Sequence, residues 1–213
     1  MLVHKAQSAL RRVKEQLNPD ERAFARCWPK INEVPGLLIS PQQERWMFDA
    51  ARGLPDLANI VEIGAFKGRS TCSFAFGCRG TNKHVYSIDT FDGNDVDFKD
   101  RDFFDEYWKN VQGCRLTNHV TPCRGRSDEL ARTWDRPIDL LFIDGSHEYE
   151  DVLADFNNFF RHVMCGGIVA LHDIDDQWPG VQRAWYDDIA NQLTGVGYCR
   201  TIGFGRKPYA STT

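Results

Sequence analysis

The feature that most constrains the fold is an alternation of short apolar segments with longer segments of helical spacing. The clearest apolar segment spans residues 138–143 and reads Ile-Asp-Leu-Leu-Phe-Ile. A nearly continuous apolar run of this length is typical of a parallel strand buried on both faces of a sheet. Five such segments are predicted as strands: 59–63, 84–88, 119–123, 138–143 and 167–171.

Between and after these strands the residue spacing changes to that of helices. Five helices are predicted, at residues 70–76, 103–112, 127–133, 149–163 and 181–193. Strands that alternate with helices indicate an α/β fold, with a doubly wound, mostly parallel Rossmann-like sheet. The tail at 198–207, which contains Gly203 and Gly205, is predicted to close the sheet as a hairpin or edge strand.

The N-terminal part of the chain predicts helices that precede the sheet. Apolar residues recur at a spacing of three and four between residues 3 and 17, which predicts an amphipathic helix that ends at Asn18-Pro19. A second helix is predicted at 42–52, with Ser40 as its N-cap and Pro41 at its first position. The first helix can pack on the main domain or contact a second subunit, and a homo-oligomer is expected.

Composition excludes several partners. The 213 residues carry 26 Lys and Arg against 30 Asp and Glu, a net charge of -4, which argues against nucleic acid and against an anionic membrane surface. The apolar runs are far shorter than the ~18 residues of a membrane span, and residues 1–18 lack the apolar segment of a signal peptide. Seven cysteines, an odd number without a C-x-x-C pair, fit a reduced, cytoplasmic compartment.

A glycine turn follows the first predicted strand. Residues 61–71 read V-E-I-G-A-F-K-G-R-S-T. A dinucleotide fingerprint needs G-x-G-x-x-G, and Phe66 stands where its second glycine belongs. A phosphate-binding P-loop needs four residues between its glycines and a Lys after the second, whereas three residues separate Gly64 from Gly68 and Arg69 follows. The pattern that remains is acidic-x-Gly-x-x-x-Gly.

Two polar positions follow the second and third strands. Asp89 ends the second strand, 25 residues beyond Gly64, where a carboxylate can accept hydrogen bonds from ribose hydroxyls or cap a helix. Ser127 follows the third strand and suits the N-cap of the next helix or the edge of a bound base.

The fourth and fifth strands are followed by four ionisable residues. Asp144 and His147 follow one strand, and His172 and Asp173 follow the other. Because parallel strands end at the same edge of a sheet, these side chains are expected to lie close together. Two carboxylates and an imidazole can hold a divalent cation, and His147 can instead serve as a general base.

The motifs in this order resemble a known family. They run E-x-G-x-x-x-G-x-S-T, then Ser-Ile-Asp, then I-D-G-x-H-x-Y-E-x-V-x-x-D, then G-G-x-x-x-x-H-D and Pro-Gly-Val. This order is similar to that of class I S-adenosylmethionine-dependent methyltransferases related to the macrocin and aminocoumarin-sugar O-methyltransferases and the cephalosporin hydroxylase-like proteins. The resemblance covers residues 37–207. It divides the chain into an N-terminal helical extension, 1–40, and a methyltransferase domain, 41–213.

The resemblance implies a role for each matching residue. The cofactor-binding set would be Glu62, Gly64, Gly68, Ser70, Asp89, Ser127 and Asp144. Within it, Asp89 would hold the ribose and Ser127 would approach the adenine. Asp144, His172 and Asp173 match the positions that bind Mg²⁺ or another divalent cation in metal-dependent members, and His147 and Asp144 would be catalytic. His172 departs from the pattern, because several of those members carry a carboxylate there and Mg²⁺ prefers oxygen ligands.

The sequence therefore predicts transfer of a methyl group from S-adenosylmethionine to a hydroxyl of a sugar, polyketide or phenolic compound. A metal-dependent hydrolase built on the four ionisable residues, a nicotinamide oxidoreductase and a non-catalytic scaffold that binds the cofactor are the alternatives. The segment 92–106 carries a net charge of -5 and is either a solvated loop or a lid over the acceptor. Trp178 either walls the acceptor pocket or packs the chain behind the fifth strand.

Overall fold

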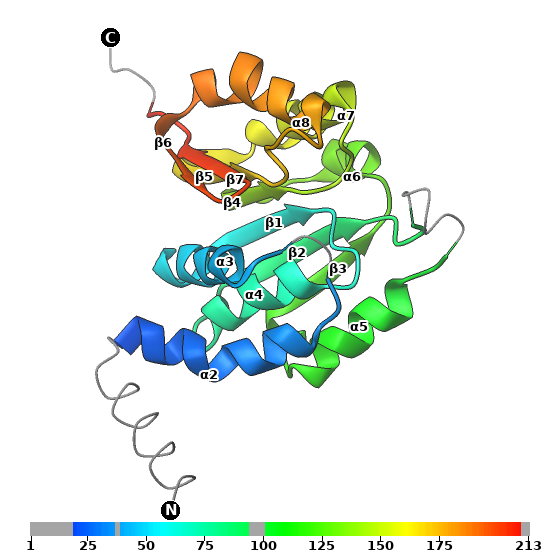
Figure 1. Cartoon of the computed structure of the whole chain (residues 1–213), viewed down its shortest axis with the longest axis vertical. Coiled ribbons are helices and arrows are strands. Elements are labelled where there is room, and N and C mark those ends of the chain that lie inside the picture. The colour runs from blue at the N-terminus through cyan, green and yellow to red at the C-terminus, as the bar shows by residue number, and fades with distance from the viewer. Residues whose placement is uncertain (1–18, 37–38, 94–100, 210–213) are drawn as a thin grey trace, which may run out of the picture.

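The computed structural model describes residues 19–36, 39–93 and 101–209 (Figure 1). Its centre is a seven-stranded sheet in the order β3-β2-β1-β4-β5-β7-β6. The strands are β1 Asn59–Ile63, β2 His84–Asp89, β3 Val120–Arg124, β4 Ile138–Ile143, β5 Val163–Leu171, β6 Thr194–Cys199 and β7 Ile202–Arg206. All five predicted strands and the predicted closing hairpin are present.

The strand order places a topological switch point between β1 and β4. The first five strands pair in parallel, whereas β7 runs antiparallel to both β5 and β6. The chain moves outward from β1 to β2 and β3, then returns to β4 on the other side of β1. Sheets of this kind bind ligands in the crevice beyond the carboxyl ends of the strands at such a point. The predicted doubly wound α/β fold is confirmed.

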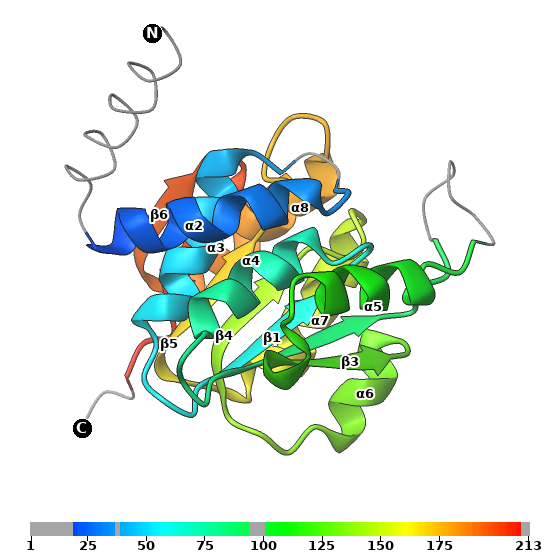
Figure 2. The same ribbon diagram turned by 90° about the horizontal axis from the view of Figure 1, so that it is seen from below.

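Helices cover both faces of the sheet (Figures 1 and 2). On one face lie α2 Pro19–Glu33, α3 Pro41–Gly53, α4 Arg69–Cys78 and α5 Phe104–Gly113. On the other lie α6 Ser127–Thr133, α7 Tyr149–Phe160 and α8 Pro179–Arg183. Alternate residues of each strand point to opposite faces of the sheet. Ile60 and Leu140 therefore pack against the first group of helices, and Val61 and Leu141 against the second. The sheet is therefore buried on both faces, as its apolar runs predicted.

Several predicted element boundaries were wrong, including the start of the third strand, because His119 lies in a 3₁₀ turn and β3 begins at Val120. Val163 was assigned to a helix, but it is the first residue of β5 because α7 ends at Phe160. Ser127 was predicted to cap α6, but Arg126 is the N-cap and Ser127 is the first helical residue. The predicted helix at 181–193 is three joined pieces: α8, a π-helical segment Ala184–Ile189 and a 3₁₀ turn Ala190–Gln192.

The helix α2 was not predicted. Pro19 was interpreted only as the end of the preceding helix, yet it is the first residue of α2 and is followed by Asp20 and Glu21. Proline at the first helical position and acidic residues in the first turn are start signals, so the sequence did contain the information. Buried Ile31 and Val34 join the core formed by α3 and α4. The predicted helix at 3–17 lies outside the described residues.

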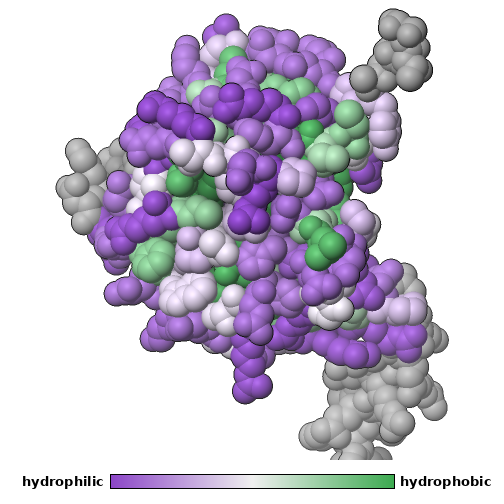
Figure 3. All heavy atoms as spheres, turned by 180° about the vertical axis from the view of Figure 1, so that it is seen from behind, coloured by the Kyte–Doolittle hydropathy of each residue, from purple (hydrophilic) through white to green (hydrophobic). Residues whose placement is uncertain are grey.

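The N-cap prediction for α3 is confirmed. Ser40 accepts a hydrogen bond from the backbone N–H of Gln43, and the side chain of Gln43 accepts one from the backbone N–H of Ser40. This reciprocal arrangement is a capping box. None of the helices in the described part of the chain is long and apolar enough to cross a membrane. The face seen in Figure 3 is largely hydrophilic, with small apolar patches scattered over it.

Candidate active site

A cavity of about 380 Å³ opens at the carboxyl ends of the central strands. It is lined by residues that follow β1, β2, β3, β4 and β5, so it lies at the switch point. Eight residues predicted from the sequence contribute to its lining: Gly64, Ser70, Asp89, Ser127, Asp144, His147, His172 and Asp173. Two predicted cofactor residues, Glu62 and Gly68, are not part of it. Their assignment as direct ligands stays a prediction.

The turn after β1 requires glycine at its first position. Gly64 has φ +88°, and a Cβ there would lie 2.0 Å from the carbonyl oxygen of Asp144. The ends of β1 and β4 thus approach so closely that only a hydrogen fits between them. Phe66 has φ +46°, a left-handed conformation that is rare for a bulky residue. Phe66, which stands in place of the second glycine of a dinucleotide-binding fingerprint, therefore still adopts a backbone conformation typical of glycine.

Asp89 fixes this turn through the main chain. Its Oδ2 accepts the N–H groups of Ala65 and Phe66 at 2.7 and 2.8 Å, and its Oδ1 accepts the N–H of Phe91 at 2.7 Å. An ionised carboxylate offers about four acceptor sites, so three bonds leave room for a ligand hydroxyl. Asp89 lines the cavity, and the predicted ribose contact therefore remains compatible with its structural role.

Glu62 lies beneath the turn and is fully buried. The hydroxyls of Thr71 and Ser87 donate to its Oε2, while its Oε1 has no hydrogen-bond partner among the described residues. Burial raises the pKa of Glu62 to about 7, although the neighbouring hydroxyls favour the charged form. Glu62 therefore links β1, β2 and α4 below the cavity.

A second buried carboxyl, that of Asp155, lines the cavity. Asp155 of α7 is 7% exposed and accepts a hydrogen bond from the Ser127 hydroxyl at 2.5 Å. Burial raises the pKa of Asp155 to about 6, even though the hydrogen bond from Ser127 lowers it. Both side chains line the cavity. Asp155 stood in the quoted motif but received no role from the sequence.

The four ionisable residues after β4 and β5 form one cluster. The His172 Nδ1 atom lies 3.1 Å from Asp144 Oδ1 and 3.0 Å from Asp173 Oδ1. The His147 Nε2 atom lies 3.1 Å from Asp173 Oδ2. A carboxylate oxygen can only accept, so His147 carries its proton on Nε2. The predicted convergence of these side chains is confirmed by the geometry, whereas their roles are not yet tested.

The protonation of the cluster follows from its crowding. Burial raises the pKa of Asp173, but the two imidazoles outweigh burial and hold it at about 2. Burial raises the pKa of Asp144 as well, opposed by His172. For His172, burial lowers the pKa, yet Asp144 and Asp173 raise it to about 10. The two carboxylates therefore favour a proton on the His172 ring.

His147 is held in place by its neighbours. Its ring stacks on Trp178 with 3.7 Å between the ring centroids. Gly180 packs against the same loop, because a Cβ there would lie 2.4 Å from the His147 carbonyl oxygen. This contact explains the glycine of the Pro-Gly-Val motif. Trp178 also lines the cavity, whereas its predicted contact with the acceptor stays a prediction.

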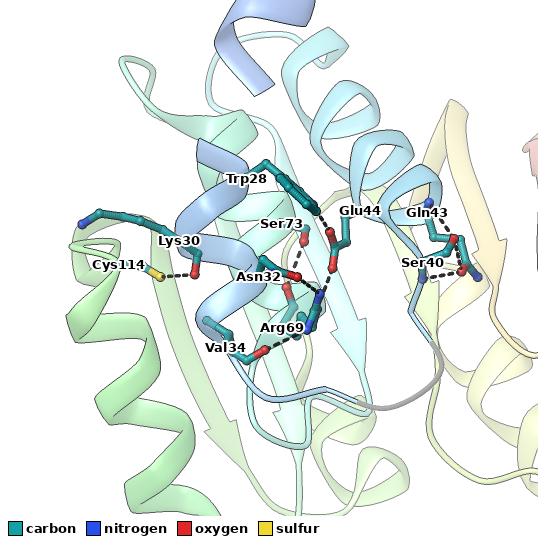
Figure 4. A network of polar contacts seen from close by, with 10 residues as sticks. All are labelled: Trp28, Lys30, Asn32, Val34, Ser40, Gln43, Glu44, Arg69, Ser73 and Cys114. Atoms are coloured by element: carbon teal, nitrogen blue, oxygen red, sulfur yellow. Dashed lines mark hydrogen bonds and ion pairs between the residues drawn. The ribbon is translucent and has the colours of Figure 1, made fainter. Parts of the chain in front are cut away.

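The segment between α2 and α3 supplies residues that the sequence did not predict. Pro35, Gly36 and Ile39 line the cavity. Arg69, the first residue of α4, bonds to Glu44 Oε1 at 2.5 Å and to the carbonyl of Val34 at 3.1 Å (Figure 4). The indole of Trp28 in α2 completes the network by donating to Glu44 Oε2 at 2.7 Å. The N-terminal helices therefore help to build the site.

The predicted acidic lid lies partly outside the described residues, since 94–100 are not described. Three aromatic residues, Phe91, Phe103 and Tyr107, are buried in the described flanks. Lys67 bridges to Glu106 at 3.0 Å and lies over the rings of Phe66 and Phe103. These contacts anchor the flanks to the turn after β1.

A model of the methyltransferase domain matches residues 61–174, which is more than half of the chain. The chain belongs to the class I S-adenosylmethionine-dependent methyltransferases. The matched region begins in β1 and ends just after β5, so it contains the glycine turn, Asp89 and the ionisable cluster. The prediction made from the motifs is confirmed at the level of the family.

Curated relatives resemble parts of this methyltransferase. An uncharacterized protein of Acanthamoeba polyphaga mimivirus, R132, is 29% identical over 148 residues, which cover 66% of this chain and 63% of the relative. A Streptomyces olivaceus enzyme, 8-demethyl-8-alpha-L-rhamnosyl tetracenomycin-C 2'-O-methyltransferase, is 33% identical over 67 residues. That match covers 31% of this chain and 17% of the enzyme. The chain thus spans less than two thirds of either relative.

Solved structures share the fold over nearly the whole chain. The O-methyltransferase TomG from Streptomyces achromogenes, solved in complex with S-adenosylmethionine, superposes with a TM-score of 0.63. The alignment covers 95% of this chain and 96% of TomG at 17% identity. At that identity the likeness establishes the fold alone. Neither the hydrolase nor the oxidoreductase alternative gains support from these matches.

Proposed function

We propose that this methyltransferase transfers the methyl group of S-adenosylmethionine to a hydroxyl oxygen of a small molecule, with His147 as general base. One observation carries the proposal. A single cavity joins the glycine turn and Asp89, which suit a nucleoside, to an imidazole held by Asp173, which suits proton removal. The names of the relatives, which include O-methyltransferases, support the same chemistry.

The cofactor would occupy the side of the cavity next to β1 and β2. Asp89 would accept hydrogen bonds from the ribose hydroxyls through its remaining acceptor sites. Ser127 and Asp155 would face the adenine, while Gly64 and Ser70 would line the methionine part. Glu62 and Gly68 would act by shaping the turn, because neither lines the cavity.

Methyl transfer is an in-line displacement at carbon. A lone pair of the acceptor oxygen forms the new O–C bond as the C–S bond breaks, and that electron pair returns to sulfur, giving a neutral thioether. The proton of the hydroxyl passes to His147. Because Asp173 holds the Nε2 proton, the other ring nitrogen is the one that accepts. The imidazolium formed is then stabilised by the adjacent carboxylate, as in other His-Asp pairs.

The size of each contribution follows from general chemistry. A positioned general base contributes a factor of about 10²–10⁴ in rate. Alignment of oxygen, methyl carbon and sulfur contributes several kcal/mol more when the reacting atoms are held about 3 Å apart. The stacked Trp178 and the Gly180 contact hold His147 for this purpose. The acceptor is proposed to be a sugar, polyketide or phenolic hydroxyl.

Calorimetric titration with S-adenosylhomocysteine tests the cofactor half of the proposal. We expect wild-type protein to bind it with micromolar affinity and Asp89→Asn to bind about tenfold or more weakly, since one charged hydrogen bond contributes roughly 1.5–3 kcal/mol. Asp102→Asn is the matched control, because Asp102 is 58% exposed and pairs with Arg124 at the surface. Equal affinity in wild type and Asp89→Asn would contradict the ribose assignment.

A turnover assay tests the proposed methyl transfer to a hydroxyl and the role of His147 as general base. Release of S-adenosylhomocysteine is followed by mass spectrometry with a panel of sugar, polyketide and phenolic acceptors. With an acceptor that reacts, His147→Gln should lower kcat by about 10²–10⁴ and leave cofactor binding unchanged. Cofactor binding without turnover of any acceptor in the panel would instead support the non-catalytic scaffold.

A further inference from the structure

The cluster of Asp144, His172 and Asp173 raises the question of a metal. One ligand atom from each residue lies within 4.8 Å of the others. The distances of 3.1 and 3.0 Å from His172 Nδ1 to the two carboxylates suit a cation, since adjacent ligands of an octahedral ion with bonds of about 2.1 Å are about 3.0 Å apart. They suit a shared proton equally well, although Nδ1 has no well-aligned hydrogen bond to either oxygen. Whether the cluster holds a cation or a proton therefore depends on the contacts of the other ring nitrogen, His172 Nε2.

Gln43 occupies the hydrogen-bonding position at His172 Nε2. The Gln43 amide nitrogen lies 2.7 Å from His172 Nε2, and both side chains are almost completely buried. A histidine that binds a metal through Nδ1 carries its proton on Nε2 and donates it to an acceptor such as a carboxylate or a carbonyl. Here Nε2 meets an N–H donor instead. The neutral ring that satisfies this contact keeps its proton on Nδ1.

The orientation of the Gln43 amide is set by the main chain. The backbone N–H of Ser40 lies 2.8 Å from Gln43 Oε1, and a backbone N–H can only donate. The Ser40 hydroxyl donates to the same oxygen at 2.7 Å (Figure 4). The amide nitrogen is thereby directed at His172 and at the Thr201 hydroxyl, 2.9 Å away. Turning the amide around would place two N–H groups against each other at Ser40.

We propose that Gln43 keeps a proton on His172 Nδ1, between Asp144 and Asp173, and that this proton excludes a divalent cation from the cluster. The cluster thus does not fit the metal that the family resemblance implies. Gln43 does not line the cavity and acts through His172, so it is a positioning residue. The consequence for catalysis rests on the proposed function.

The variant Gln43→Glu tests this assignment, because it keeps the shape and the capping box but replaces the donor at Nε2 with an acceptor. Mn²⁺, which accepts imidazole and carboxylate ligands, is titrated into full-length protein at pH 7.5 and the free ion is followed by electron paramagnetic resonance. We expect wild-type protein to show no Asp144-dependent binding below 1 mM, a limit on the order of weak carboxylate sites. Gln43→Glu should bind at least about tenfold more tightly, because the Nε2–H of a metal-bound His172 would then donate to the Glu carboxylate. Adding Asp144→Asn should abolish the gain.

Binding of Mn²⁺ by wild-type protein that is lost in Asp144→Asn would overturn the proposal. A folded Gln43→Glu protein, with unchanged thermal stability and affinity for S-adenosylhomocysteine, that gains no Mn²⁺ binding would overturn it too. Should that variant not fold, ¹⁵N NMR of wild-type protein decides, since a His172 ring protonated on Nε2 alone contradicts the assignment. Failure of S-adenosylhomocysteine to bind in every protein would count against the proposed function and leave the metal result standing.

Discussion

The two sides of the cavity are built by different means. Next to β1 and β2, the carboxylate of Asp89 binds three main-chain N–H groups, and Gly64 lets two strand ends approach each other. Next to β4 and β5, the site consists of side chains that contact other side chains, with His172 between Asp144 and Asp173. The first side is shaped by main-chain contacts. The second depends on which side-chain atoms carry protons.

This difference predicts how each side responds to change. The side next to β1 and β2 should tolerate charge-preserving substitutions at its rim, but it should lose its structure when a Cβ is added where none fits. The side next to β4 and β5 should tolerate small changes in shape, but its function depends on which nitrogen or oxygen is a hydrogen-bond donor. The largest effects are expected at Gly64 in the turn after β1 and at Glu62 beneath that turn. The smallest is expected at Ser40, whose cap on α3 orients Gln43 toward the cluster.

The largest effect is expected for Gly64→Ala. The new Cβ would lie 2.0 Å from the Asp144 carbonyl oxygen at a φ of +88°. The left-handed conformation costs about 1–2 kcal/mol and overpacking adds about 1–3 kcal/mol, so the free energy of unfolding should fall by about 4 kcal/mol. Urea denaturation measures the loss, and calorimetry should show that S-adenosylhomocysteine binding disappears.

Gly80→Ala separates these two costs. Gly80 has φ +77°, but no atom of the described part of the chain lies within 4 Å of the added Cβ. It should therefore lose only about 1–2 kcal/mol, and it should bind the cofactor product like wild type. Equal losses at the two glycines would show that β1 and β4 can separate without harm, and the side next to β1 and β2 would then be less rigid than we argue.

The next effect concerns Glu62 and pH. Its folded-state pKa is raised to about 7 from an ordinary value of 4.5, so the folded protein binds this proton more tightly than the unfolded chain. Stability should therefore fall as pH rises from about 4.5 to about 7, and the penalty persists above that range. A difference of this size corresponds to about 3 kcal/mol. Glu62→Gln removes the titration and should flatten the pH dependence of Tm in this window.

The matched control for that scan is Glu150→Gln, at an exposed position of α7. It should leave the pH dependence of Tm as it is in wild type. A Glu62→Gln profile that still falls between pH 4.5 and 7 would mean that another buried carboxyl, with Asp155 the first candidate, carries the effect. The role of Glu62 beneath the turn would then need revision.

Local patterns predicted most of the fold because they report burial directly. The run at 138–143 is apolar because both faces of β4 are covered, and that reason needs no knowledge of distant residues. Val163 was misassigned because an apolar residue between a helix and a strand fits either element. The start of α2 was missed although Pro19 and the acidic residues after it were visible, since a proline both ends one helix and begins the next.

The site was predictable only where its residues follow strands. Asp89, Asp144 and Asp173 were found because parallel strands end at one edge. Gln43 was not, because it lies 129 residues before its partner His172 and only the packing of α3 brings them together. The roles of Pro35 and Ile39 in the cavity depend likewise on how the Arg69 network holds the segment after α2.

The smallest effect, from Ser40→Ala, tests whether the two sides of the comparison are as separate as their construction suggests. Loss of the capping hydroxyl should lower the free energy of unfolding by about 1 kcal/mol, measured by urea denaturation. The backbone N–H of Ser40 remains, and it alone can keep the Gln43 oxygen turned away from His172. Mn²⁺ should therefore still be excluded, unlike in Gln43→Glu. A gain of Mn²⁺ binding here would show that a side-chain hydroxyl orients the amide, and the proton on His172 would then depend on side chains alone.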